Sequence, residues 1–340
     1  KKKKMNIKIK TFLLSCIFVW SCTNTETPEK QNKKTDLQLL ALQAQVKTIT
    51  SFTIQPANPE ATQMLEPVKT RHMEFNEAGY LTLSHEFRGN PTPFATNDYT
   101  YNAKGLLAAR KETRHYKEPI ITNYAYTYNE VDSLTQMEVD NGFNQWTYYT
   151  QRDAKNRPIL KQVIQDDTVA SLYKMTYDTQ GNLTREESYY TETHPDKFIS
   201  RTFNENGQKV KEVITDFKDT GDTLHYTNHF FYKDDQLSRE ERNKTSDSVY
   251  TEITYTYHPN GKLQQEIIMP KGAENYAIII QKYNTHGDIT YHASNFNSDP
   301  KKDIFTTQYT YDTHANWTEK TNYKNDTIVS KTTRDITYYE

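Results

Sequence analysis

The side chains best able to do chemistry in this sequence are its ten histidines, and two of them stand close together. His225 and His229 are four residues apart, a spacing that on a helix would let both bind one metal ion. The residues around them alternate as in a strand, however, where the pair would lie about 13 Å apart. His258, His286 and His314 fall at predicted turn positions. We therefore expect surface and turn histidines, with no metal site and no cofactor.

Neither the acidic pairs nor the possible nucleophiles form a recognisable catalytic arrangement. Asp166-Asp167 and Asp234-Asp235 lack the alternating oxygen ligands and the glycine of a calcium loop. Serine and aspartate are scattered, no nucleophile elbow is present, and neither is a glycine-rich phosphate loop. The sequence therefore predicts a protein that is not an enzyme.

One short pattern is over-represented: Asp, then Ser or Thr, then an aliphatic residue. It occurs five times, where composition would give about one or two. The pattern resembles the O-glycosylation acceptor sequence of some Gram-negative periplasmic proteins. The alternative is that Asp ends a turn and the next two residues begin a strand, so that a structural repeat makes the pattern recur. The hydroxyl residues concerned are Ser133, Thr168, Thr223, Ser248 and Thr327.

The bulk composition favours a β protein and argues against nucleic acid as a partner. The 340 residues have a net charge of -2, so no long-range field attracts the chain to nucleic acid or to an anionic membrane. The chain has 26 Tyr and 14 Phe, which are residues that favour strands. Hydrophobic content is only 34%, as expected for a single layered sheet with one wet face.

Residues 1–21 have the features of an export signal. Lysines precede an apolar run of roughly ten residues, which is too short to span a bilayer permanently. The run ends at Val19-Trp20-Ser21-Cys22, which resembles the lipobox of bacterial lipoproteins. The resemblance implies that Cys22 is acylated and anchors the protein to a membrane, as an outer-membrane lipoprotein facing the periplasm or the cell surface. An ordinary cleaved signal is the alternative.

Two short segments follow this signal. Residues 22–35 are polar and charged, which predicts a flexible tether. Residues 36–70 contain a short helix, with Thr35 as its N-cap, and a strand within residues 45–55. We expect these two elements to form an N-terminal cap on the rest of the chain.

From residue 71 to residue 340 the sequence is built of repeats. Each unit begins with an aromatic residue, then Asn or Asp, two variable residues, Gly, one variable residue and an aliphatic residue. Eight copies and two degenerate ones give ten units, whose starts are 24 to 29 residues apart, a spacing typical of a repeat architecture. The units begin at Phe75, Tyr101, Tyr128, Arg152, Tyr177, Phe203, Tyr232, Tyr257, Tyr283 and Tyr311.

The repeat motif predicts a β-hairpin turn. Asn or Asp caps backbone N–H groups of the turn, and glycine supplies a positive φ that a Cβ would resist. Ten hairpins give about twenty strands with one aromatic and aliphatic face, and so wide a sheet must coil or close to hide that face. We therefore predict an all-β fold: about ten tandem antiparallel β-hairpins forming one coiled, spiral or barrel-like sheet, apolar side inward. The turn glycines are Gly79, Gly105, Gly181, Gly207, Gly261 and Gly287.

Units such as YDTQGNL at Tyr177 and YNTHGDI at Tyr283 resemble the YD repeats of the RHS family, and the resemblance covers residues 71–340. It implies the spiralling β-sheet of that family. In the family's large toxins the spiral encloses a toxic domain, but far fewer repeats are present here, so encapsulation and self-cleavage are not expected. The chain is more similar to the short repeat-bearing lipoproteins of Gram-negative bacteria.

These observations together predict an exported, lipid-anchored protein of the cell envelope that acts as a binding or adhesion module for a glycan or a protein. Extended repeat surfaces suit such a role. Trp146 and Trp317 could stack on a sugar or pack in the core of the sheet. A structural or assembly component of an envelope complex, with no soluble ligand, is the alternative hypothesis, and a hydrolase is the third.

Overall fold

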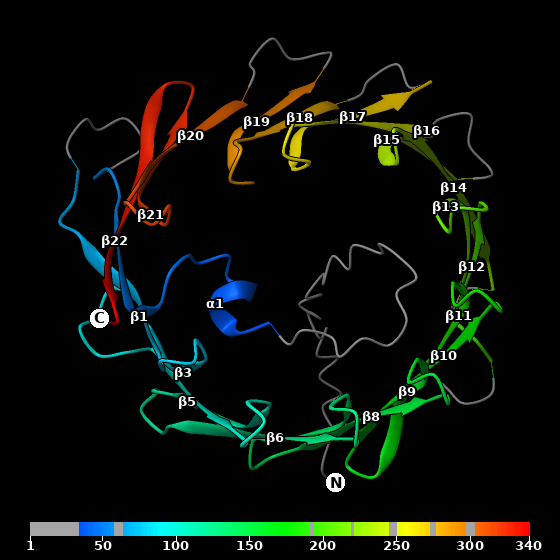
Figure 1. Cartoon of the computed structure of the whole chain (residues 1–340), viewed down its shortest axis with the longest axis horizontal. Helices are drawn as coiled ribbons and strands as arrows, with labels where there is room; N and C mark the ends of the chain where they lie inside the picture. Colours follow the sequence, from blue (N-terminus) through cyan, green and yellow to red (C-terminus); the bar gives the residue numbers. More distant parts are fainter. Residues whose placement is uncertain are drawn as a thin grey trace, which may run out of the picture.

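The computed structural model describes residues 34–57, 64–190, 194–218, 221–244, 250–272, 277–296 and 303–340. In these residues 22 antiparallel strands form one sheet that closes around a central space, which confirms the prediction of an all-β hairpin fold (Figure 1). The elements are α1 (Asp36–Leu39), β1 (Val46–Ile54), β2 (Val68–Phe75), β3 (Leu81–Glu86), β4 (Ala95–Tyr101), β5 (Leu107–Arg114), β6 (Ile120–Tyr128), β7 (Leu134–Asp140), β8 (Gln145–Arg152), β9 (Pro158–Gln165), β10 (Thr168–Tyr177), β11 (Leu183–Tyr189), β12 (Lys197–Phe203), β13 (Lys209–Phe217), β14 (Thr223–Lys233), β15 (Gln236–Lys244), β16 (Tyr250–Tyr257), β17 (Leu263–Lys271), β18 (Ala277–Tyr283), β19 (Ile289–Phe296), β20 (Asp303–Tyr311), β21 (Trp317–Lys324) and β22 (Thr327–Tyr338).

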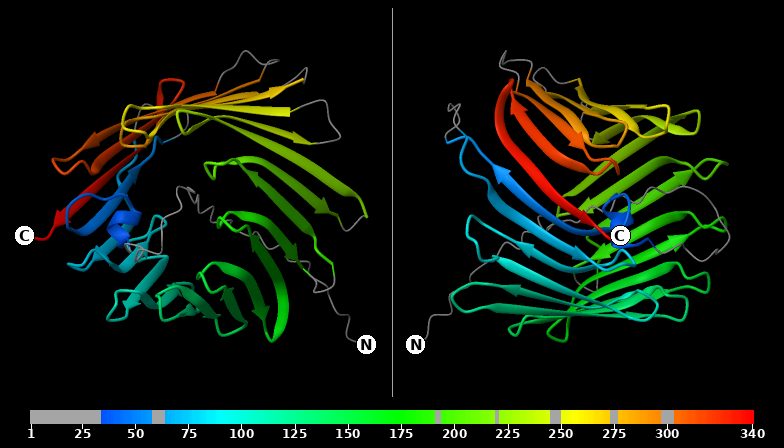
Figure 2. Two further views of the ribbon diagram at one scale, coloured as in Figure 1. Left: turned by 45° about the vertical axis from the view of Figure 1, so that its right-hand side comes forward. Right: turned by 60° about the vertical axis from the view of Figure 1, so that its left-hand side comes forward.

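The strand β1 closes the sheet. Thr50 is opposite His72 of β2 on one edge and opposite Asp335 of β22 on the other, so both edges of β1 are paired. Figure 2 shows β1 and β22 side by side, although they lie at opposite ends of the chain. The sequence predicts that residues 36–70 form an N-terminal cap of a short helix and a strand. Within that range β1 is a full member of the sheet, and its two pairings satisfy the backbone groups that open edges would leave unpaired.

The turn of each repeat has the geometry that its residues dictate. In the unit that starts at Tyr101, the Asn102 side-chain oxygen accepts hydrogen bonds from the backbone N–H groups of Lys104 and Leu106, both at 3.0 Å. The six motif glycines have φ values between 67° and 101°. Where the motif lacks glycine, another residue takes the left-handed conformation: Asp132, Asn156, Asp235 and Ala315.

The tyrosine that opens a unit ties it to the unit before. The Tyr101 hydroxyl donates to the Leu81 carbonyl at 2.9 Å, and the Tyr128 hydroxyl donates to the Leu107 carbonyl at the same distance. Equivalent hydrogen bonds are made by Tyr177, Tyr232 and Tyr257. Each hydroxyl bonds near the start of the second strand of the preceding hairpin. It therefore links successive hairpins in addition to the backbone hydrogen bonds between their strands. This explains why most of the units open with Tyr, since Phe has no group that could reach the carbonyl.

The main hydrophobic cluster lies where β1, β2 and β3 meet α1. Thr35 and Gln38 form a capping box that begins the helix, and Leu37 packs among Val46, Ile49, Met73, Phe75 and Leu81. Asp36 accepts hydrogen bonds from the Leu81 backbone N–H at 2.9 Å and from the Tyr101 hydroxyl at 2.8 Å. Figure 1 places α1 inside the ring of strands. Within the described part of the chain, no helix has the length and hydropathy needed to cross a membrane.

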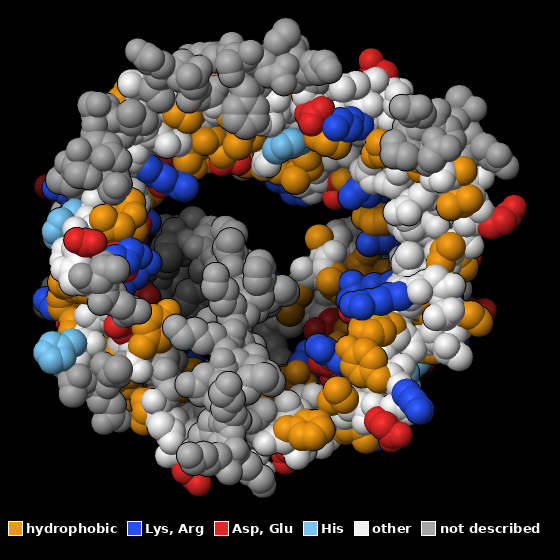
Figure 3. Space-filling view, turned by 180° about the vertical axis from the view of Figure 1, so that it is seen from behind, with side chains coloured by type: hydrophobic (Ala, Val, Ile, Leu, Met, Phe, Trp, Pro, Cys, Tyr) orange, Lys and Arg blue, Asp and Glu red, His pale blue; other side chains and the backbone are white. Residues whose placement is uncertain are grey.

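The inner face is more polar than the sequence predicts. Ile49 and Met73 pack on α1 inside the ring, so Ser51 and Arg71, two residues further along the same strands, also face inward. Arg, Lys, Asp and Glu side chains lie among apolar ones around the central hollow (Figure 3). The prediction of an apolar inner side is therefore correct only in part. A sheet of 22 strands encloses a space too wide for its own side chains to fill, so the inner face stays accessible to water.

Candidate binding surface on the inner face

The strand register aligns charged side chains in a row across the inner face. Arg334 of β22 is opposite Ser51 of β1, Ser51 is opposite Arg71 of β2, and Arg71 is opposite Glu86 of β3. The row continues through Ala95 of β4 to Arg114 of β5. Because directly opposed residues of antiparallel strands share a face, side chains far apart in the sequence come together here.

Two adjoining hollows of about 350 and 440 Å³ open over this row, and they share Arg71, Glu86 and Arg88. We call their combined lining the arginine hollow. Its charged members are five arginines and two glutamates: Arg71, Arg88, Arg110, Arg114, Arg334, Glu86 and Glu112. Cations therefore outnumber anions in the hollow, although the chain as a whole is slightly acidic.

The two ends of the hollow differ in how their arginines are held. The guanidinium carbon of Arg334 lies 3.3 Å from the ring centroid of Trp317, and its buried Nε has no hydrogen-bond partner within the described residues. Burial, together with the charge of Arg71, lowers the pKa of Arg334 to about 10. The guanidinium nevertheless remains protonated at neutral pH, so keeping this charge lowers the stability of the folded protein.

At the other end of the hollow one carboxylate serves several donors. Glu112 accepts hydrogen bonds from Arg114 at 2.6 Å and from the Tyr124 hydroxyl at 3.3 Å, and it lies 3.9 Å from Arg110. Arg110 stacks on the Tyr124 ring at 3.7 Å. In the same way Arg88 stacks on the Phe94 ring at 3.6 Å. Aromatic rings thus hold three of the five guanidinium planes, which leaves the edges of those planes to bind other groups.

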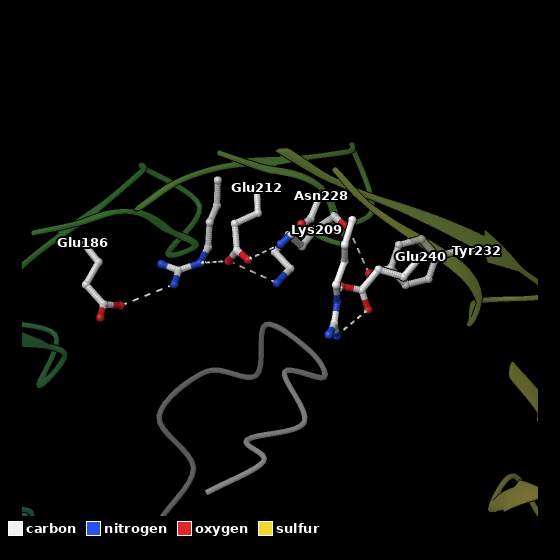
Figure 4. A network of polar contacts seen from close by, with 8 residues as sticks. Glu186, Lys209, Glu212, Asn228, Tyr232 and Glu240 are labelled. Atoms are coloured by element: carbon white, nitrogen blue, oxygen red, sulfur yellow. Dashed lines mark hydrogen bonds and ion pairs between the residues drawn. The ribbon is translucent and has the colours of Figure 1, made fainter. Parts of the chain in front are cut away.

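A second charged region of the inner face spans β11 to β15, and its charges are matched. Arg201 lies between two carboxylates, with Nη2 3.4 Å from Glu186 and Nε 2.9 Å from Glu212. Glu212 also lies 3.4 Å from the Lys209 ammonium and accepts a hydrogen bond from Asn228 at 3.2 Å (Figure 4). In Arg201 the nitrogen Nη1 lacks a hydrogen-bond partner within the described residues, but the other contacts of this guanidinium are to carboxylates. In Arg334, by contrast, no nitrogen is paired with a carboxylate in the part of the chain described.

The same region includes a bidentate pair. Glu240, which is only 5% exposed, accepts hydrogen bonds from Arg242 at 2.7 and 3.2 Å and from the Tyr255 hydroxyl at 3.2 Å. Burial and the carboxylate of Glu240 raise the pKa of Tyr255, so its hydroxyl remains a donor. We call this set the paired network: Glu186, Arg201, Lys209, Glu212, Glu240 and Arg242.

Burial alone would raise the pKa of Glu212, but the charges of Lys209 and Arg201 outweigh it and lower the pKa below the ordinary value of 4.5. Glu212 is therefore ionised at neutral pH and offsets the charges of its two cationic neighbours. The paired network is thus neutralised from within, and it has no cationic surplus to offer a ligand.

The structure does not bring the residues singled out from the sequence into one site. Thr168, Thr223 and Thr327 are exposed at the starts of β10, β14 and β22, whereas Ser133 is half-buried in a motif turn and accepts a hydrogen bond from Asn156 at 2.6 Å. In the units of Ser133, Thr168 and Thr327, the preceding aspartate has a positive φ, as the turn interpretation requires. Cys22 and Ser248 lie outside the described residues.

The two histidines that stand close together in the sequence lie on one strand. His225 and His229 both lie on β14, and His225 pairs with Thr215 of β13 at 3.2 Å. No group of three or more metal-binding side chains occurs among the residues that the structure describes. The arginine hollow was not predicted from the sequence, although one signal was present: Arg110, Glu112 and Arg114 alternate and therefore share a face of β5.

No family model and no curated protein sequence matches this chain. Among solved structures, the chain is similar to a TcdB2-TccC3 toxin complex, with a TM-score of 0.38, 14% identity and coverage of 78% of this chain. A Tc holotoxin pore of Photorhabdus luminescens gives a TM-score of 0.37, 13% identity and 84% coverage. The chain spans only 16% and 18% of the lengths of these two proteins.

A porin-like protein from Bacteroides uniformis is similar over 86% of this chain and 96% of its own length, with 10% identity and a TM-score of 0.29. At this level of similarity none of these proteins indicates a function for the chain.

Proposed function

We propose that this chain is a non-catalytic binding protein of the cell envelope, an RHS-like repeat protein whose ligand, a glycan or a protein, lies against the inner face of the closed sheet. The observation that carries the proposal is the arginine hollow, where five arginines face two glutamates on a surface open to water. A charge surplus of this kind on a concave surface favours a ligand of complementary charge.

The chemistry of the hollow supports binding rather than catalysis. Guanidinium groups stay protonated at working pH, so they recognise anions but do not act as general bases. The half-buried carboxylate of Glu112 is already engaged by Arg114 and Tyr124.

The location rests on the sequence of residues 1–22. The proposal places the protein at the outer membrane, exported and anchored through an acylated Cys22. Cell fractionation tests this directly: the native protein should be in the membrane fraction with added acyl mass, and Cys22→Ala should be soluble and lack that mass. Equal fractionation of both proteins would contradict the lipid anchor. The same intact-mass measurement would reveal or dismiss added hexose at the Asp-Ser/Thr positions.

The binding function is tested with the full-length protein extracted in mild detergent. We expect reproducible binding on a glycan array or capture of a defined protein in a pull-down. No reproducible ligand in either experiment would contradict the proposal. Co-purification of one envelope protein at fixed stoichiometry, without glycan binding, would instead favour the structural role.

A further inference from the structure

Three arginines of the hollow lack an acidic partner in the described part of the chain. No ion pair within 4.0 Å joins Arg71, Arg88 or Arg334 to a carboxylate there, and the row places Arg334 and Arg71 on either side of the small Ser51. Glu86, opposite Arg71, is exposed, and no ion pair is formed between them. These like charges therefore repel one another until an anion lies between them.

We propose that the arginine hollow binds an acidic oligosaccharide through its carboxylate or sulfate groups. The inference rests on the proposed function and specifies its ligand class. A planar guanidinium presents two parallel N–H donors along its edge, which match the two oxygens of a carboxylate or the oxygens of a sulfate. Arg334 on Trp317 and Arg88 on Phe94 are both held face-on by a ring, so their edges are preorganised for such contacts.

The arrangement favours an extended ligand over a single small anion. The row runs from Arg334 on β22, through β1, β2, β3 and β4, to Arg114 on β5. Five strand spacings separate its ends, a span of roughly 24 Å. The two hollows adjoin along this row, and each has a volume that suits a ligand of drug size. Several linked acidic groups would fill this length, which one free sulfate cannot do.

Uncharged polar side chains lie among the cations. Ser51, Ser84 and Asn97 are buried on the same face and line the two hollows. Their hydroxyl and amide groups can both donate and accept hydrogen bonds, as the hydroxyl groups of a sugar ring require. A mixture of such side chains with arginines suits a ligand that has both anionic and hydroxyl groups.

Two other classes of polyanion fit the hollow less well. A peptide that binds through its backbone adds a strand to a free sheet edge, but β1 closes this sheet and both of its edges are paired, which leaves an acidic peptide only its side-chain contacts to the arginines. Single-stranded nucleic acid stacks its bases on open aromatic faces. Here guanidinium groups cover one face each of Trp317, Phe94 and Tyr124.

Calorimetry with four soluble probes tests the proposal: an oligogalacturonate, a sulfated dextran oligosaccharide, neutral dextran of matched length, and poly-glutamate. We expect the full-length protein to bind an acidic saccharide, with an affinity that falls as salt rises, and not to bind neutral dextran. Arg71→Gln and Arg334→Gln should each weaken binding about tenfold or more, because each removes a charge-assisted contact. The two acidic saccharides distinguish a carboxylate ligand from a sulfate ligand.

The matched control is Arg239→Gln. Arg239 also stacks on a ring, Phe231 at 4.1 Å, but it lies on the outer face opposite Thr254. Its substitution should leave affinity unchanged, and thermal unfolding should show that all three variants are folded. An equal loss for Arg239→Gln, or tighter binding of poly-glutamate than of the saccharides, would overturn the proposal. Binding of a neutral glycan or a protein, unaffected by the two hollow variants, would overturn this inference but leave the proposed function standing.

Discussion

The arginine hollow and the paired network occupy the same face of one sheet, yet their charges are arranged in opposite ways. In the paired network Glu212 offsets Arg201 and Lys209, and Glu240 offsets Arg242. In the arginine hollow Arg334 is half-buried beside a like charge and bound to no carboxylate in the described residues. Removing one partner of a buried pair leaves an uncompensated charge, so the paired network depends on both of its signs, whereas the unpaired charge of Arg334 lowers stability until a ligand offsets it.

The difference has a structural origin in the register. Across β12 and β13 the register sets Arg201 opposite Glu212, which are unlike charges, so they attract. Across β22, β1 and β2 it sets Arg334 and Arg71 on either side of Ser51, so no acid lies between them. The same hairpin architecture therefore supports two regions with different roles, and substitutions in each should have different consequences.

The largest expected effect is the loss of Glu212. Glu212→Ala leaves Arg201, which is only 15% exposed, and Lys209 without their shared carboxylate. We expect the free energy of unfolding to fall on the order of 3 kcal/mol, because uncompensated charges remain partly buried. Urea denaturation measures the change. Glu86→Ala in the arginine hollow is the control, and its free energy of unfolding should change by no more than about 0.5 kcal/mol. Equal losses of stability in the two variants would show that the two regions do not differ in how their charges are held.

Replacing an arginine with methionine should affect the free energy of unfolding differently in the two regions. Arg201→Met breaks two ion pairs and should destabilise the protein by about 2 kcal/mol. Arg334→Met removes an unpaired, half-buried charge while keeping an apolar side chain on Trp317, so stability should stay the same or rise by about 1 kcal/mol. Thermal unfolding without ligand measures both. Strong destabilisation by Arg334→Met would mean that this arginine has a structural role.

The turns at the two regions provide a further comparison. Gly105, between β4 and β5, and Gly181, between β10 and β11, both have positive φ. Gly181→Ala should cost about 1 kcal/mol from backbone strain alone, since the nearest atom to a new Cβ is 3.8 Å away. Gly105→Ala should cost about 2 kcal/mol, because its Cβ would lie 2.5 Å from the Tyr80 hydroxyl. Unchanged unfolding curves for both would show that strain at these turns is negligible.

Acidification should weaken the paired network selectively. The pKa of Glu212 is lowered in the folded protein, so the stability that it contributes is present above pH 4.5 and is lost as pH falls through the lower folded value. Burial raises the pKa of Glu266, so its contribution has the opposite sign and improves slightly on acidification. Urea denaturation between pH 7 and pH 3 should show a smaller loss for Glu212→Gln than for the wild type. An identical loss of stability in the variant and the wild type would show that groups other than Glu212 cause the acid sensitivity.

Local chemistry explains what could be predicted from the sequence. The Asn-x-x-Gly spacing determines the turn at each unit, and alternation of Tyr and Thr determines the strands, so the hairpins and their approximate number followed from residues close in the chain. The sequence left open whether the sheet would be coiled, spiral or barrel-like, so its closure was not predicted. Closure depends on contacts such as the 2.7 Å hydrogen bond between Thr48 and Thr337, which are 289 residues apart.

The arginine hollow escaped prediction for the same reason. Arg71 and Arg334 are remote in sequence, and only the pairing of β22 with β1 and of β1 with β2 places them on either side of Ser51. The alternation of Arg110, Glu112 and Arg114 does show that they share a face of β5, but it does not reveal whether that face is inside the ring. The tyrosine hydroxyl bonds between units likewise depend on three-dimensional register, although the frequent Tyr at the motif start was visible.

The central claim is that the arginines of the hollow are held for an acidic ligand. Thermal unfolding of the wild type and of the double variant Arg71→Gln/Arg334→Gln, each with and without the sulfated dextran oligosaccharide, tests it most directly. We predict that the ligand at 100 times its Kd stabilises the wild type by about 2.7 kcal/mol and the double variant by much less. Equal stabilisation of both proteins, or none of the wild type by any acidic saccharide, would contradict the claim.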